Sequence, residues 1–339
     1  MFTLRSRRAA RRVLAVAAAT SMLGLAACSN GADSNSSAAR DSDRVVKVEN
    51  CGGTVKIKGV PQHVLIMNNP AVNTLYELGV LDDVKTRAGV FPREYYDDKV
   101  WAKLQGIKVL SDKIDGGGHL KLSREVVVSA APDLVIGTTD NVNRKTLEPH
   151  NIPLVQEETL CGGLDGDSKW ADIDDHIDLY AKIFNKEAEG EKLKAKVDKR
   201  VQDVIKEVSG GDEDRSVAVL WPTVGGGTNY AYGRGSMSNP IVTSAGLKNV
   251  FGDQEKRVFE VNAEQIVARQ PDVILALYSE GDPEDVKQAV RDLVGSKSLP
   301  AVENDMILPM LLNFAEAPSL LSVKGLETLN QFLKDHPKK

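Results

Sequence analysis

The sequence is poor in histidine, cysteine and aromatic residues, and it has no long apolar run. Its 339 residues include five histidines and three cysteines, and aromatic side chains make up 5%. The apolar run Val13–Ala27 has fifteen residues, whereas a membrane-spanning helix needs about 20. Zinc and manganese sites need several imidazoles and carboxylates that converge on one ion. We expect no protein-bound metal, because the histidines are scattered without ligand spacing: His63, His119, His150, His176 and His336.

Motifs of the common enzyme classes are also missing. The sequence has no Gly-x-Ser-x-Gly elbow, no Gly-x-x-x-x-Gly-Lys-Ser/Thr phosphate loop and no His-Glu-x-x-His. The triplet Gly225-Gly226-Gly227 does not have the spacing of a dinucleotide fingerprint. We therefore expect neither catalytic residues nor a cofactor. A secreted hydrolase with an unrecognised site is the alternative from another class, and turnover of a substrate would distinguish it from a protein that only binds.

The first residues indicate export. Five arginines and no acidic residue precede the apolar run: Arg5, Arg7, Arg8, Arg11 and Arg12. A basic start before a short apolar core is typical of a signal peptide. The run ends in Leu25-Ala26-Ala27-Cys28, which resembles the lipobox of bacterial lipoproteins, with the Cys28 thiol as the nucleophile that takes the diacylglyceryl group. A plain secretory signal is the alternative, and the residues leave general and twin-arginine export both open.

We predict a lipoprotein signal peptide over residues 1–27 and a flexible tether over residues 28–44. Residues 29–43 are rich in Ser, Ala, Asn and Asp, and such a segment cannot bury enough apolar surface to offset its ordering entropy. The chain is then anchored by lipid to the outer face of the cytoplasmic membrane. Removing residues 1–27 leaves 43 − 5 = 38 basic against 48 acidic residues, a formal charge of −10. This balance argues against nucleic acid as a partner.

Two cysteines remain once Cys28 is lipidated. Cys51 and Cys161 are an even pair in an oxidising compartment, so we predict that they form a disulfide. Two separate buried thiols are the alternative. Roughly 295 ordered residues exceed a single core and predict two domains.

Strands that alternate with helices predict two α/β lobes. Residues 45–48 and 54–57 suggest a hairpin, and a helix is expected over residues 70–78 after a strand at 63–67. Further buried strands are expected at 133–137, 153–156, 216–221, 272–277 and 306–309, and a helix is expected near Ser238. We predict Rossmann-like lobes with parallel sheets at residues 45–170 and 211–339, joined through linking helices at residues 171–210.

One pattern occurs in both halves. Glu125 stands seven residues before Pro132-Asp133, and Glu264 stands seven residues before Pro271-Asp272; each Pro-Asp opens an apolar run. A short helix that ends at proline and leads into a buried parallel strand explains the pattern. The shared offset predicts a duplicated lobe architecture.

Between the halves, residues 172–208 have a helical composition. We expect two helices that break near Asn185, because one apolar stripe follows it at spacings of three and four: Leu193, Val197, Val201, Val204, Ile205 and Val208. The second helix, of about 23 residues, would be about 35 Å long and would cross from one lobe to the other. Such a strut predicts small lobe movements on binding.

The lipobox, the matched units and the long helix together resemble the helical-backbone class of ABC-importer binding proteins, which take ferric siderophores, haem and cobalamin. The resemblance covers about residues 45–335, and Glu49-Asn50-Cys51-Gly52 looks like actinobacterial members that handle iron complexes. It implies a monomer that captures a ferric siderophore and delivers it to an ABC permease. Haem, cobalamin and a deazaflavin precursor stay open as ligands.

The resemblance also implies that Glu125 and Glu264 dock on the permease through arginine pockets. Charge-assisted contacts of this kind favour orientation and on-rate. The alternative is that both are ordinary first-turn glutamates favoured by the helix dipole.

Ligands of α/β domains gather at the carboxyl ends of strands. Arg234 offers a forked donor, and aromatic rings stack on flat conjugated groups; the alternative is that the aromatic residues pack into the lobe core. His119 is a candidate for hydrogen bonding or haem ligation. The expected ligand-binding residues are Asn69, Arg93, Tyr95, Tyr96, His119, Trp221, Tyr230, Tyr232 and Arg234, with Asn68 beside them and Asn313 and Phe314 at the rim.

Overall fold

The computed structural model describes residues 44–114, 120–162, 166–208 and 215–337. The chain divides into two units, residues 1–40 and residues 41–339, and the described residues belong to the second. The predicted signal peptide, Cys28, most of the tether and His119 therefore lie outside the described residues. No helix in the described part is long and apolar enough to span a membrane.

An antiparallel hairpin begins the described chain. It pairs β1 (Val45–Asn50) with β2 (Gly53–Lys58) across a two-residue turn. Cys51 and Gly52 both have positive φ, 50° and 71°, which is the backbone of the primed turns that match strand twist. A disulfide joins Cys51 to Cys161, the pairing expected from the sequence. Beside it, Asn50 donates to the Gln156 carbonyl at 2.9 Å, so the hairpin is fastened to the first lobe.

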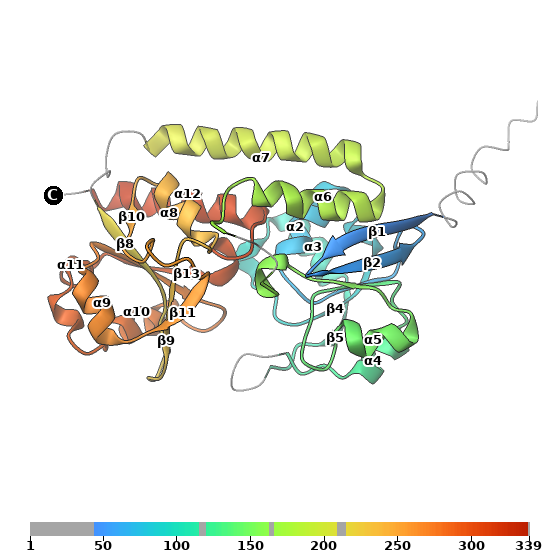
Figure 1. Ribbon diagram of the computed structural model, residues 1–339, viewed down its shortest axis with the longest axis horizontal. Helices are drawn as coiled ribbons and strands as arrows, with labels where there is room; N and C mark the ends of the chain where they lie inside the picture. The colour runs from blue at the N-terminus through green and yellow to red at the C-terminus, as the bar shows by residue number, and fades with distance from the viewer. Residues whose placement is uncertain (1–43, 115–119, 163–165, 209–214, 338–339) are drawn as a thin grey trace, which may run out of the picture. The chain divides into compact units, whose positions relative to one another are not determined.

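The first lobe is a five-stranded parallel sheet, as predicted (Figure 1). Its strands run in the order β5-β4-β3-β6-β7, so the chain starts in the middle and winds outward in both directions. Ligands of such sheets bind where the strand order reverses, here at the carboxyl ends of β3 and β6. The strands are β3 (Val64–Ile66), β4 (Val84–Ala88), β5 (Lys108–Ser111), β6 (Leu134–Ile136) and β7 (Leu154–Val155). The helices are α2 (Pro70–Glu77), α3 (Asp98–Gln105), α4 (Arg124–Ala130) and α5 (Arg144–Leu147).

The sheet of the second lobe is mixed, which corrects the expectation that both sheets are parallel. Its order is β11-β9-β8-β12-β13, with β10 also paired to β8. β8 pairs in parallel with β10 and β12, whereas β9 is antiparallel to both β8 and β11. The glycine-rich segment after β8 is a hairpin turn, and so short a connection can only reverse the chain. The strands are β8 (Ser216–Trp221), β9 (Asn229–Tyr232), β10 (Lys248–Asn249), β11 (Val258–Val261), β12 (Val273–Tyr278) and β13 (Ile307–Leu311). The helices are α8 (Ser238–Ser244), α9 (Ala263–Arg269), α10 (Pro283–Arg291), α11 (Pro300–Glu303) and α12 (Leu320–Asp335).

The matched Pro-Asp units occupy equivalent positions in the two lobes. Helices α4 and α9 each have seven residues and end at a residue with positive φ, 47° at Ala131 and 44° at Gln270. The following strand pairs with the first strand of its lobe, β6 with β3 and β12 with β8. The Asp133 carboxylate accepts the backbone N–H groups of residues 62 and 63, and the Asp272 carboxylate accepts the N–H and hydroxyl of residue 216. Each aspartate thus fixes the beginning of its lobe's first strand.

Two helices link the lobes, α6 (Asp172–Phe184) and α7 (Glu187–Val208). They break at Asn185, which has a φ of 58°, as expected. Helix α7 packs against α6 and against α12 of the second lobe, and in Figure 1 it runs along the top of both lobes. Ion pairs join it to its neighbours, among them Lys194–Asp178 at 2.8 Å, Lys196–Glu77 at 2.8 Å, Arg200–Glu327 at 2.6 Å and Lys334–Glu207 at 3.2 Å. The predicted fold class, two α/β lobes joined by one long helix, is confirmed.

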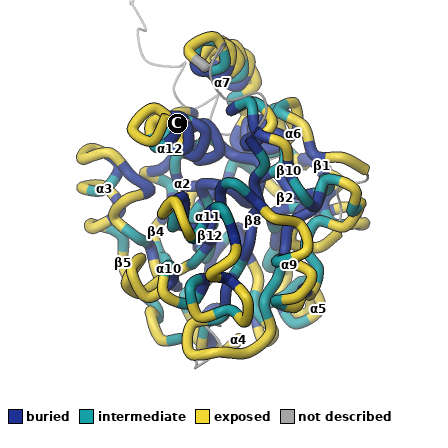
Figure 2. Tube along the Cα trace, turned by 90° about the vertical axis from the view of Figure 1, so that its left-hand side faces the viewer, coloured by how far each residue is buried: buried dark blue, intermediate teal, exposed yellow. Residues whose placement is uncertain are grey.

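The lobes share one buried core. A continuous cluster of buried apolar residues extends from the hairpin through the first lobe and α7 to the second lobe. Four residues of the α7 stripe belong to it: Leu193, Val197, Val201 and Val204. Figure 2 shows the central strands buried and the outer helices and turns exposed. Burial of this kind couples the lobes, because separating them would expose apolar surface.

Candidate ligand-binding site

Arg87 was not among the ligand-binding residues predicted from the sequence. It lies in β4, in register with Ile66 of β3 and Val109 of β5. Its guanidinium carbon stands 5.3 Å from the centre of the Phe91 ring. Its Nε is buried without a hydrogen-bond partner, and the described residues form no ion pair with the guanidinium. Burial lowers the pKa of Arg87, but an arginine stays protonated at neutral pH, so a partly buried positive charge has no ion-pair partner among the described residues.

Two of the expected ligand-binding residues meet beside Arg87. The Tyr96 hydroxyl donates to the Asn69 side-chain oxygen at 2.6 Å, and the Asn69 amide donates to the Val90 carbonyl at 3.2 Å. Tyr96 is buried and stacks on Trp101 with ring centres 6.2 Å apart. Burial raises the pKa of Tyr96, so its phenol stays neutral. The bond between them holds Asn69 at the carboxyl end of β3.

Tyr95 joins the two lobes. It lies in the 3-10 turn η2 (Arg93–Tyr95), and its hydroxyl accepts the backbone N–H of Asn313 at 3.0 Å. Its ring packs edge-on against Phe314, with centres 4.9 Å apart. Burial raises the pKa of Tyr95. Tyr278, which ends β12 on the facing lobe, has its pKa raised by burial and next by the nearby carboxylate of Glu94. The facing edges of the two lobes therefore carry Tyr95 and Tyr278, whose phenols are both neutral.

The second lobe contributes a stripe of aromatic side chains from β8 and β9. Trp221 stands opposite Tyr230 in the antiparallel pair, so both lie on one face of the sheet. Both are half-buried, and Trp221 packs against the core. Tyr232 lies two residues farther in and is only 5% exposed. Its pKa is raised by burial, and next by the buried carboxylate of Glu316. Tyr232 is therefore a core residue in this structure, whereas Trp221 and Tyr230 lie at the carboxyl edge.

The two arginines that the sequence analysis favoured already have partners within the chain. Arg234 forms ion pairs with Asp167, at 2.6 Å, and with Glu255. Its carbonyl also accepts the Ser168 N–H at 3.1 Å, so it ties the second lobe to the segment before α6. Arg93 pairs with Asp98 on its own lobe. Both therefore have ion-pair partners, whereas Arg87 has none among the described residues.

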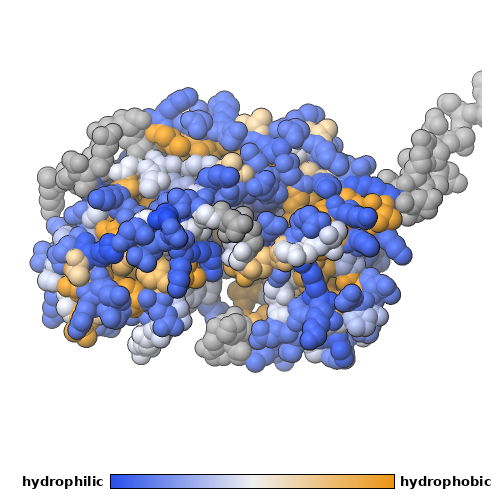
Figure 3. All heavy atoms as spheres, viewed as in Figure 1, coloured by the Kyte–Doolittle hydropathy of each residue, from blue (hydrophilic) through white to orange (hydrophobic). Residues whose placement is uncertain are grey.

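Cavities at the lobe contact are acidic. One of about 440 Å³ lies between η2 and α12 and includes Glu77, Glu94 and Asp97 with one lysine, Lys324. Another, of about 300 Å³, lies beside β7 and α6, and its carboxylates outnumber its single lysine. Acidic linings disfavour an anionic ligand. An anion is better placed at the carboxyl edge near Arg87, and Figure 3 shows the surface hollowed between the lobes on the lower side of that view.

His176 is a buried residue whose ring contacts other buried polar side chains. His176 of α6 contacts Thr74 through Nε2 at 2.9 Å and Glu157 through Nδ1 at 3.0 Å, and all three side chains are buried. Over the described ranges, no group of three or more His, Cys, Asp and Glu side chains is arranged to hold a metal ion.

The chain is similar to known proteins both in sequence and in fold. A model of the family described as periplasmic binding protein matches residues 65–309. The chain is similar to a crystal structure of an ABC-type Fe³⁺-hydroxamate transport system from Saccharomonospora viridis DSM 43017, at 42% identity and a TM-score of 0.79, covering 85% of this chain and 98% of that chain.

Two other solved structures share the fold. They are the periplasmic haem-binding protein RhuT from Roseiflexus sp. RS-1 (18% identity, TM-score 0.59, 81% of this chain and 98% of that chain) and the vitamin B12 binding protein BtuF of Vibrio cholerae (16%, 0.56, 81% and 98%). A comparison with curated proteins gave no match.

Proposed function

Because this chain belongs to the periplasmic binding protein family, we propose that it captures a ferric hydroxamate outside the cytoplasm and delivers it to an ABC permease. It is a substrate-binding transport protein and not an enzyme. The observation that carries the choice of ligand is the 42% identity to the Fe³⁺-hydroxamate transport system over 98% of that chain. The haem- and vitamin B12-binding proteins share only the fold, at 18% and 16% identity, so haem and cobalamin stay as alternatives, as does a deazaflavin precursor.

The site chemistry supports this choice. Hydroxamate oxygens that coordinate ferric ion are electron-rich, and a guanidinium donates to such oxygens through its planar fork. Arg87 supplies that fork, and no carboxylate of the described residues forms an ion pair with it. Asn69 and Tyr96 lie beside it, and Trp221 and Tyr230 supply aromatic surface from the facing lobe. The ligand brings its own iron coordination, which agrees with a described chain that offers no metal-binding cluster.

We also propose that Cys28 carries the anchor after removal of residues 1–27, and that the protein works as a monomer on the outer face of the cytoplasmic membrane. The Leu25-Ala26-Ala27-Cys28 sequence supports this. Two acyl chains suffice for stable attachment, whereas one gives only reversible binding.

Tryptophan fluorescence of the protein from Ser29 onward tests the ligand. Trp101 stacks on Tyr96, so a chelate bound beside Arg87 should quench its emission. We expect saturable quenching by a ferric hydroxamate at sub-micromolar concentration, and none by the iron-free hydroxamate. Ferric catecholate, ferric citrate, haem and cobalamin are the comparison ligands. Saturation by haem or cobalamin alone would replace the proposed ligand and leave the transport role.

Reversing both docking charges should abolish uptake without changing ligand affinity. Glu125 and Glu264 are exposed in the first turns of α4 and α9. The pKa of Glu125 is lowered, chiefly by its own backbone N–H and then by Arg124, so it is ionised at neutral pH. The double variant Glu125→Lys/Glu264→Lys removes both anionic contacts with the permease. Uptake of ferric hydroxamate in cells and fluorescence titration of the purified protein are compared, and normal uptake would disprove docking through these residues.

A further inference from the structure

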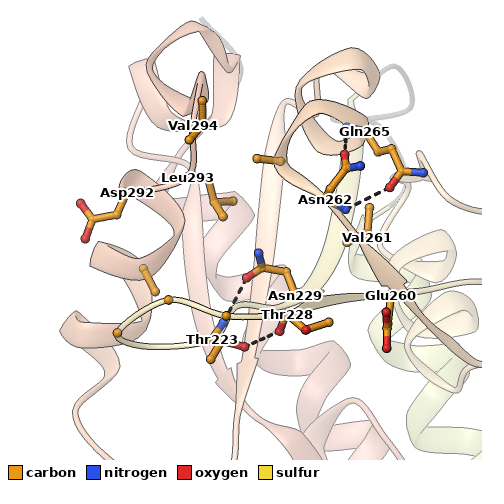
Figure 4. A pocket seen from close by; sticks show the side chains of 15 residues that line it. Thr223, Thr228, Asn229, Glu260, Val261, Asn262, Gln265, Asp292, Leu293 and Val294 are labelled. Atoms are coloured by element: carbon orange, nitrogen blue, oxygen red, sulfur yellow. Dashed lines mark hydrogen bonds between the residues drawn. The ribbon is translucent and has the colours of Figure 1, made fainter.

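The second lobe carries a groove of about 850 Å³ on the surface next to Glu264 (Figure 4). Three segments form it: the turn between β8 and β9, the turn between β11 and α9, and the end of α10. Glu264 itself stands between two lining residues, Ala263 and Gln265. The groove is therefore continuous with the expected docking point of this lobe.

The charge of the groove is negative. Its lining includes Glu260 and Asp292 and no lysine, arginine or histidine. Both acids are exposed, and Figure 4 shows them on opposite sides of the groove. Within the described ranges Glu264 has no ion-pair partner, whereas Glu125 on the first lobe is paired with Arg124 at 2.8 Å. Among the described residues, the glutamate of the second lobe is thus unpaired and the glutamate of the first lobe is paired.

Aliphatic side chains line part of this groove: Val261, Leu293 and Val294. Val294 is 81% exposed, and Val224, which is 54% exposed, stands in the chain between the lining residues Thr223 and Gly225. Val224 belongs to the β8–β9 turn, whose base is fixed by a hydrogen bond from the Thr223 N–H to the Asn229 side chain at 3.1 Å. The next residues, Gly225, Gly226 and Gly227, have φ of 81°, 91° and 138° and no side chains to cover the groove. An acidic groove with aliphatic rims complements a basic segment that also bears aliphatic side chains.

We propose that this groove receives a basic, aliphatic-flanked segment of the permease and makes the second lobe the more strongly held end of the docked protein. The inference rests on the proposed function, in which the chain docks on an ABC permease through Glu125 and Glu264. It adds a contact of the second lobe to the two matched glutamates. The positive charge of this permease segment would face Glu260, Glu264 and Asp292 together.

Site-specific photo-crosslinking in cells tests the contact. A photoreactive phenylalanine derivative is placed at Val224, Val294, Glu264 or Val45, and crosslinked partners are identified by mass spectrometry. Val45 is a matched control, since it is also 54% exposed but lies on the hairpin of the first lobe. We expect crosslinks to the membrane-embedded permease subunit from residues 224, 264 and 294, and none from residue 45. Crosslinks from residue 264 alone would overturn the groove contact and leave docking intact. Crosslinks from none of them would overturn both.

Charge reversal gives a second readout. Glu260→Lys/Asp292→Lys should lower uptake at limiting ligand by about tenfold or more, with unchanged ligand affinity. The control is Glu303→Lys/Asp335→Lys, which changes the net charge equally on the same lobe. Asp335 also matches Asp292 locally, since each accepts a hydrogen bond from a glutamine four residues earlier, at 2.9 Å and 2.7 Å. Equal losses in both variants would overturn the proposal.

Discussion

Replacing Arg87 by methionine is expected to weaken ferric hydroxamate binding by about 10- to 100-fold, the equivalent of a charge-assisted hydrogen bond of 1.5–3 kcal/mol. The same change should leave the ligand-free protein as stable as before or more stable. The guanidinium is partly buried, its Nε has no hydrogen-bond partner, and no carboxylate of the described residues forms an ion pair with it. A buried charge without a partner costs stability, and an apolar side chain of similar length removes that cost.

Two further variants separate this effect from general damage. Arg87→Lys keeps the charge but loses the fork, so we expect an intermediate affinity. Arg93→Met removes an arginine that is paired with Asp98 and should change affinity less. Affinity is read from tryptophan quenching and stability from urea unfolding. Unchanged affinity in Arg87→Met would remove Arg87 from the binding site.

Removing the disulfide should lower the free energy of unfolding by about 2–5 kcal/mol. Cys51 and Cys161 are 110 residues apart in sequence, and closing so long a loop restricts the unfolded chain strongly in the entropic account. In the folded protein the bond fastens the hairpin turn to the segment after β7. For a chain of this size the expected loss corresponds to a fall in Tm of roughly 3–8 °C.

The variant Cys51→Ala/Cys161→Ala is compared with the parent protein by thermal and urea unfolding. Reduction of the parent protein by dithiothreitol should reproduce the same loss, because it opens the same bond. Thiol titration of the unreduced, unfolded protein from Ser29 onward provides the independent check, and two free thiols would contradict the pairing.

Local patterns carried most of the fold prediction. The hairpin, the helix break at Asn185 and the Pro-Asp units each depend on a few neighbouring residues whose backbone preferences are strong. The matched spacing of Glu125 and Glu264 extended these local signals to the arrangement of two lobes. The antiparallel strands β9 and β11 were missed because the glycines before β9 were interpreted only as a loop.

The binding site was harder to predict, because a side chain's partners come from distant parts of the chain. Arg234 was expected to bind the ligand, yet its guanidinium pairs with Asp167, which lies 67 residues earlier in the sequence. Tyr232 was expected at the same site, but the strand pairing places it one step inside the lobe. Arg87 was overlooked because it lies in a short strand, and its only signal was an arginine next to the buried Ala88. Tyr278 gave no signal beyond its place at a strand end.

Helix α7 is fixed to both lobes by packing and by ion pairs on each side, so the outline of the protein changes little when a ligand enters. A permease that recognises that outline meets empty and loaded carriers with similar affinity. Empty carriers then act as competitive inhibitors of the loaded ones. A cell that makes more carrier than the available ligand can fill would slow its own import, which sets an upper limit on useful expression of this protein.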